Sequence, residues 1–95
     1  MLVKKDILGK DLEVALQIFD ISNKKGGEAY FSNLVKILNG TVSRNRISQA
    51  LDRLFDQGIL TAEFKKIDSK WARVYKVSGE AEGFLQDIYS KVIKE

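Results

Sequence analysis

The chain has 95 residues, of which 31% are charged, and a formal net charge of +3; it contains no cysteine, histidine or proline. This length allows one domain, residues 1–95, with a small core. The absence of cysteine excludes disulfides and thiolate metal sites. The absence of histidine removes the commonest metal ligand and the commonest general base. We therefore expect no catalytic site, no metal and no other cofactor.

Charge and hydropathy indicate the kind of partner. No apolar run is long enough to span a membrane, and no secretory signal pattern is present, so we expect a cytoplasmic protein without a membrane partner. Residues 44–76 carry eight basic and four acidic side chains. A basic module of this kind is typical of proteins that bind polyanions, although heat-adapted proteins also have charge-rich surfaces.

The first predicted helix has apolar residues on two sides. Residues 1–9 fit either a helical extension or an arm, and residues 10–23 predict a helix. One stripe consists of Leu12, Ala15, Leu16 and Phe19; a second, nearly opposite, consists of Val14, Ile18 and Ile21. Because so small a domain has one core, the second stripe predicts a partner subunit. The alternative is that terminal helices of the same chain cover it.

Two further helices are predicted around a tight turn. Residues 29–31 fit a very short strand, and Ser32 is positioned to cap a short helix that ends at Asn39-Gly40. Residues 43–57 predict the next helix, capped by Ser43 and stopped by Gly58. Its apolar stripe consists of Ile47, Ala50, Leu51 and Leu54. A helix, a turn containing glycine and a second helix form a helix-turn-helix unit.

The opposite face of the 43–57 helix carries long hydrogen-bonding side chains. Asn45 and Gln49 lie opposite the apolar stripe, Arg46 and Arg53 lie along one flank, and Arg44 is in the first turn. Such side chains donate to base edges and phosphates, as a DNA recognition helix requires. An ordinary amphipathic helix with a solvated face is the alternative.

A β-hairpin and a last helix complete the chain. Residues 59–67 and 71–77 are rich in aromatic and β-branched residues, and 68–70 supply the turn. We expect Tyr75 in the core and Trp71 packed under the hairpin or against a neighbouring helix, rather than stacked on nucleic acid. Ser78 is positioned to cap a helix over residues 79–94. Its broad apolar stripe consists of Ala81, Phe84, Leu85, Ile88, Tyr89 and Val92.

This order of elements resembles the winged helix-turn-helix superfamily of transcription regulators, including its small MarR, PadR and ArsR types. The resemblance covers residues 11–92 and is carried by T-V-S-R-N-R-I-S-Q-A-L-D-R-L-F-D-Q-G-I-L at 41–60 and Y-K-V-S-G-E at 75–80. It implies an α+β, mostly helical fold with a three-helix core, a β-hairpin wing and an extra C-terminal helix. MarR-type chains are longer, and this chain lacks the Cys and His clusters of ArsR-type metal sensors.

The resemblance implies a sequence-specific regulator of transcription that binds double-stranded DNA. Helix 43–57 would enter the major groove, and wing 59–77 would contact the backbone or the minor groove. The matching DNA-binding positions are Ser43, Arg44, Asn45, Arg46, Ser48, Gln49, Arg53, Lys65, Lys66, Lys70 and Arg73. Asp52 and Asp56 depart from this pattern, because they would repel phosphates unless turned away or paired with arginine.

Unmatched apolar surface on the terminal helices predicts a homodimer. The expected interface residues are Val14, Ile18, Ile21, Phe84, Leu85, Ile88, Tyr89 and Val92. The sequence does not determine whether a small-molecule effector exists. Two alternatives stay open: a winged-helix module for protein contacts, and an architectural DNA binder without sequence preference.

Overall fold

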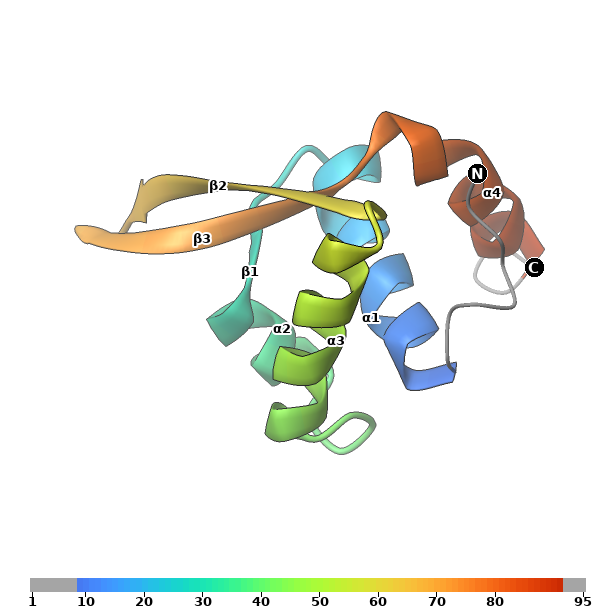
Figure 1. Cartoon of the computed structure of the whole chain (residues 1–95). Coiled ribbons are helices and arrows are strands. Elements are labelled where there is room, and N and C mark those ends of the chain that lie inside the picture. The colour runs from blue at the N-terminus through green and yellow to red at the C-terminus, as the bar shows by residue number, and fades with distance from the viewer. Residues whose placement is uncertain (1–8, 92–95) are drawn as a thin grey trace.

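The structure is a computed structural model and describes residues 9–91. Figure 1 shows the helices clustered on one side and a long hairpin reaching away from them. The elements, in chain order, are α1 (Gly9–Ile18), η2 (Phe19–Lys24), β1 (Ala29–Tyr30), α2 (Phe31–Ile37), α3 (Arg44–Asp56), β2 (Leu60–Ile67), β3 (Lys70–Val77) and α4 (Gly79–Tyr89). None of the helices described between residues 9 and 91 combines the length and hydropathy needed to cross a membrane.

The first predicted helix is α1 continued by the π-helical η2. Both of its stripes lie in the core of the same chain, because α1 contacts α3 and α4 while η2 contacts β3. Val14 and Ile18 are completely buried, and Ile21 packs against the same core. The prediction that this stripe requires a partner subunit was therefore wrong for Val14 and Ile18. Leu85 of α4 is also completely buried and is likewise unavailable to a partner.

The second helix begins earlier than the pattern predicted. The Oδ1 of Asn33 accepts the backbone N–H of Tyr30 at 2.9 Å, and its Nδ2 donates to the carbonyl of Glu28 at 2.7 Å. Asn33 thus satisfies the backbone at the start of α2, and Ser32 is not the cap. β1 immediately before it has only two residues and pairs with β3, so the sheet order is β1-β3-β2.

Helix α3 is formed as predicted. The Oγ of Ser43 accepts the backbone N–H of Arg46 at 3.2 Å, and Gly58 has a φ of +78°, which favours glycine after the last turn. Its stripe of Ile47, Ala50, Leu51 and Leu54 is buried. Burial of this stripe fixes which side of α3 faces solvent.

The predicted hairpin is confirmed, with a shorter turn than expected. β2 and β3 pair without interruption from Leu60 opposite Val77 to Ile67 opposite Lys70. Asp68 and Ser69 form the two-residue turn with φ values of 50° and 71°. Positive φ at both central residues gives a turn whose twist matches that of the flanking strands.

Side chains from η2 fix the base of the hairpin. The Oγ of Ser22 donates to the carbonyl of Tyr75 at 2.8 Å. The amide of Asn23 bonds to both the N–H and the carbonyl of Val77. Ser78, which caps α4 as predicted, also donates to the carbonyl of Gly58 at 2.8 Å. The base of the wing is therefore rigidly placed relative to α3, and its distal half projects.

Candidate nucleic-acid interface

The polar face of α3 is exposed over its first two turns. Asn45, Ser48 and Gln49 are exposed. Arg44 is also exposed, and its guanidinium lies 5.1 Å from the centre of the Phe31 ring. Because the opposite stripe of the helix lies in the core, the backbone that carries these side chains is held in place. The structure brings together the donors and acceptors that base reading requires.

Ser43 and Arg46 are partly used by the helix itself. The Ser43 oxygen accepts the N–H of Arg46, which leaves the hydroxyl hydrogen for another acceptor. Arg46 is half-buried, and its Nε has no hydrogen-bond partner among the described residues. The Nε of Arg46 would therefore lose no hydrogen bond within the chain if the guanidinium turned toward a phosphate or a base.

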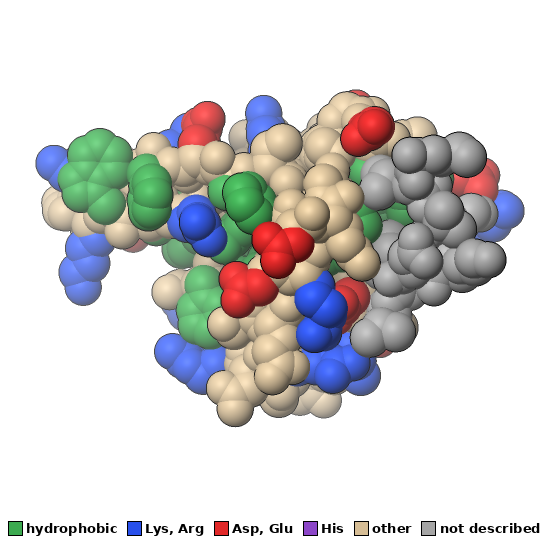
Figure 2. All heavy atoms as spheres, in the orientation of Figure 1, with side chains coloured by type: hydrophobic (Ala, Val, Ile, Leu, Met, Phe, Trp, Pro, Cys, Tyr) green, Lys and Arg blue, Asp and Glu red, His purple; other side chains and the backbone are tan. Residues whose placement is uncertain are grey.

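The last turns of α3 are acidic. Asp52 and Asp56 are exposed on the face that also carries Asn45 and Gln49, and Figure 2 shows acidic side chains over the middle of this view with basic ones below them. Asp52 interacts electrostatically with Arg73 of the wing. No group of three acidic side chains in the described part of the chain is placed to hold a metal ion. The exposed cations and amides of α3 that are free of neighbouring acids therefore lie in its N-terminal half.

Arg53 holds two helices together. Its Nε and Nη2 donate to the two carboxylate oxygens of Asp11 on α1, at 2.7 and 2.9 Å. The Asp11 side chain is 3% exposed, and its hydrogen bonds raise the pKa of Arg53 above its ordinary value. A carboxylate buried this deeply needs its cationic partner. A phosphate contact from Arg53 stays a prediction, and it would have to share the guanidinium with Asp11.

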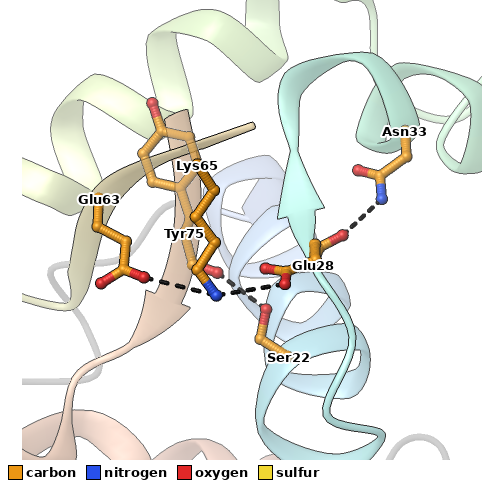
Figure 3. Close-up of polar contacts among 6 residues, drawn as sticks. All are labelled: Ser22, Glu28, Asn33, Glu63, Lys65 and Tyr75. Carbon is orange, nitrogen blue, oxygen red and sulfur yellow. Dashed lines mark hydrogen bonds and ion pairs between the residues drawn. The ribbon is translucent and has the colours of Figure 1, made fainter. Parts of the chain in front are cut away.

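Lys65 is neutralised within the chain. Figure 3 shows its Nζ between the carboxylates of Glu28 and Glu63, at 3.3 and 3.5 Å. The hydrogen bond to Glu28 is the main reason that the pKa of Lys65 lies above its ordinary 10.5. Since two carboxylates surround one ammonium group, Lys65 adds no net positive charge to the wing.

The other predicted cations of the wing are exposed. Lys66 and Lys70 have no carboxylate partner among residues 9–91. Arg73 is exposed as well, and hydrogen bonding to Tyr75 raises its pKa above the ordinary value, with Asp52 adding to the shift. Lys66 and Lys70 are thus the wing cations most available to phosphate.

Two aromatic side chains on the wing are exposed, and for Trp71 this contradicts the prediction. Phe64 and Trp71 are each 68% exposed, so the prediction that Trp71 packs under the hairpin was wrong. Tyr75, at the base, is 5% exposed and lies in the core as expected. Two eight-residue strands extend about 26 Å, further than the helices reach beneath them. The length of the strands relative to the helices that cover them was the signal that could have identified Phe64 and Trp71 as exposed.

Apart from Leu85, the predicted dimer residues of α4 that the structure describes are only partly buried. Phe84, Ile88 and Tyr89 pack against the core without being enclosed by it, and Val92 lies outside the described residues. The Tyr89 hydroxyl donates to Asp20 at 2.6 Å, and its ring meets Phe19 edge-on with centroids 5.6 Å apart. Tyr89 is therefore satisfied within the chain, and Phe84 and Ile88 remain as candidates for an interface.

The fold is similar to that of several solved structures. A variant of ZitR from Lactococcus lactis matches 95% of this chain and 56% of its own, with a TM-score of 0.71 and 9% identity. MarR from E. coli matches over 93% and 59%, with a TM-score of 0.70 and 18% identity. The adhesin competence repressor AdcR from Streptococcus pyogenes matches over 96% and 63%, with a TM-score of 0.66 and 12% identity.

These likenesses show the fold. The chain has the winged-helix fold, with the helical core and hairpin wing that the sequence predicted. It spans between half and two thirds of the length of these three proteins. No protein-family model matches the sequence, and no curated protein sequence does.

Proposed function

We propose that this winged-helix chain binds double-stranded DNA sequence-specifically and regulates transcription. The first two turns of α3 would enter the major groove, and the wing would contact the backbone or the minor groove. One observation carries the proposal: a helix whose apolar stripe is fully buried presents hydrogen-bonding side chains on its opposite, exposed face. Those side chains are Arg44, Asn45, Ser48 and Gln49.

The regulatory role is supported by two further observations. The sequence at 41–60 resembles the recognition helix of winged-helix transcription regulators. One protein with the same fold, AdcR, is by name a repressor. A regulator must distinguish its site from a large excess of other duplex, so base reading by α3 is the property to test.

A binding titration distinguishes specific from non-specific DNA binding. Affinity for a site selected from random duplex is compared with affinity for unselected duplex at two salt concentrations. A specific reader keeps a ratio of about 10³ or more at physiological salt, whereas an architectural binder loses most of its affinity for both DNAs together. A module for protein contacts would bind neither.

Gln49 provides a test of base reading. Gln49→Ala is expected to lower affinity for the selected site by about 1–3 kcal/mol, because an amide pairs bidentately with a base edge, and to leave random-duplex affinity nearly unchanged. Gel-shift titrations on both duplexes measure the two losses. Equal losses on the two DNAs would show that Gln49 reads no base.

Lys70 provides a test of phosphate contact by the wing. Lys70→Ala is expected to weaken binding to every duplex similarly and to reduce the slope of log K against log salt by about 0.9, because one phosphate contact is lost. Lys91→Ala is the matched control, since Lys91 is an exposed cation of similar size that lies beyond the wing, paired with Asp87. A slope unchanged by Lys70→Ala would place the turn of the wing away from DNA.

We also propose that two copies bind together. In support, Phe84 and Ile88 are not enclosed by residues 9–91, and one copy offers only one short reading surface. A two-fold pair would place two copies of α3 about one DNA turn, roughly 34 Å, apart. Linking two such modules raises affinity by about 10²–10⁴ without new contacts to DNA.

Ile88 is the residue to change in a test of the dimer. Ile88→Glu is expected to yield monomers and to weaken binding to a two-half-site duplex by about 100-fold, because a carboxylate would be buried at the interface. Sedimentation velocity gives the oligomeric state, and thermal denaturation confirms folding. Gln86→Glu, two residues away on α4, is the control. A wild-type monomer at micromolar concentration that still binds this duplex tightly would contradict the model.

A further inference from the structure

The distal half of the wing carries an aromatic and cationic strip on one face. Residues directly opposite in an antiparallel pair share a face of the sheet. Phe64 lies opposite Arg73, and Lys66 lies opposite Trp71. Phe64 and Trp71 are diagonal neighbours, for which the usual Cα separation is about 7–8 Å. Both rings are 68% exposed, so this face has no cover from the described part of the chain.

Cations alternate with the rings along this face. The Arg73 guanidinium lies 5.4 Å from the Phe55 ring on α3 and 6.0 Å from the Phe64 ring. The Lys66 ammonium lies 5.9 Å from the Trp71 ring. We call these five residues the aromatic-cationic strip. Figure 2 shows the corresponding feature at the left: hydrophobic side chains exposed on the wing, with Lys and Arg side chains beside them.

The strip does not stabilise the core of the chain. At 68% exposure, Phe64 and Trp71 bury little apolar area, so truncating either should cost little stability. The centre of an apolar protein interface is usually depleted of lysine, whereas here Lys66 lies over a ring and Lys70 lies beside the turn. The composition therefore favours a ligand that has both flat π faces and negative charge.

A single-stranded nucleic acid has that chemistry. Unpaired bases stack on exposed aromatic side chains, and the adjoining phosphates pair with cations. In a duplex each base is already stacked on its neighbours, so the rings would gain no flat partner without distortion. Asp52 interacts with Arg73 at the end of the strip nearest α3 and would direct the phosphates toward Lys66.

We propose that the aromatic-cationic strip is a second nucleic-acid site, which binds unpaired bases by stacking on Phe64 and Trp71. This site lies on the wing, apart from the polar face of α3. Its binding of single strands is a function separate from the duplex reading proposed for α3. DNA and RNA single strands share the required chemistry. The site accepts a base of any identity, because stacking requires only a π face.

Trp71 makes the test direct, because it is the only tryptophan in the sequence. Its fluorescence is followed during titration of the full chain with a twelve-nucleotide deoxythymidine strand, the matching uridine strand and an abasic strand of equal length. The thymidine or uridine strand is expected to quench Trp71 and to bind at least fivefold more tightly than the abasic strand, because stacking contributes about 1–3 kcal/mol per base. A deoxyuridine strand of equal length matches the uridine strand in its bases, so a preference between these two strands distinguishes DNA from RNA as the source.

Two variants separate stacking on the strip from a general effect of exposed apolar side chains. Phe64→Ala keeps the reporter and is expected to weaken thymidine-strand binding by at least about fivefold. Ile37→Ala removes another exposed apolar side chain, 49% exposed and located on α2, and should change nothing. Equal binding of the abasic and thymidine strands, or no effect of Phe64→Ala, would overturn the proposal. Quenching of Trp71 fluorescence by an increase in protein concentration without nucleic acid would also overturn the proposal. The strip would then be covered by a second copy of the chain.

The same variants distinguish this site from the proposed duplex reader. Gln49→Ala should spare the single strand, and Phe64→Ala should spare recognition of the selected duplex. Failure of single-strand binding with intact duplex reading would reject the strip as a site and leave the function of α3 standing. The reverse result would reject the duplex reader alone.

Discussion

Phe19→Ala is expected to lower the free energy of unfolding by about 3–5 kcal/mol, because it empties a large volume that the core cannot refill. Phe19 is 2% exposed, lies where α1 continues into η2, and meets the Tyr89 ring of α4 edge-on. The loss would be a large fraction of the stability of so small a domain. Urea denaturation followed by circular dichroism measures it.

Phe64→Ala is the matched control for this prediction. It removes the same ring from a position that is 68% exposed, and the expected change is within about 0.5 kcal/mol. Similar losses for the two variants would contradict the arrangement described, in which η2 and α4 close one core and the wing projects beyond it.

Removing both arginines from the start of α3 is the change expected to have the largest effect on DNA binding. Arg44→Ala combined with Arg46→Ala should weaken binding to a selected duplex by about 2–6 kcal/mol, since each arginine that pairs bidentately with a base contributes about 1–3 kcal/mol. Fluorescence anisotropy at constant salt measures the loss. Folding should persist, because neither guanidinium makes an ion pair within residues 9–91.

A charge-matched variant controls for the loss of two positive charges. Lys24→Ala combined with Lys91→Ala removes the same net charge from exposed positions on η2 and beyond the end of α4. A small, sequence-independent loss is expected. If the double lysine variant lost as much DNA affinity as the double arginine variant, binding would depend on overall charge and not on the surface of α3.

Local patterns predicted the elements of this fold well, and the reason is physical. The stripe from Ile47 to Leu54 has helical spacing, Ser43 can cap, and Gly58 can adopt a positive φ, so sequence, helix and burial agree along α3. The two-residue turn at Asp68-Ser69 differs from the predicted turn by one residue. Such boundaries depend on the register of pairing between strands, which alternation alone does not fix.

The errors came from contacts between residues far apart in the chain. Arg53 pairs with Asp11, which lies 42 residues earlier, and no local pattern links the two. The apolar stripe containing Val14 and Ile18 predicted a partner subunit, because helical spacing does not reveal which other elements cover a helix. In the structure, contacts of η2 with β3 and of α1 with α4 bury both residues. Trp71 has the alternation of a half-buried strand residue, but it lies where no helix remains beneath the sheet.

Selection of bound sequences from a pool of random duplex is the most direct test of sequence reading by α3. The full chain is incubated with the pool at physiological salt, and bound DNA is amplified and sequenced over several rounds. We expect enrichment of one motif with two inverted half-sites about 10 base pairs apart, and loss of that enrichment with Gln49→Ala. A pool that remains random after repeated rounds with folded protein would contradict sequence-specific duplex recognition.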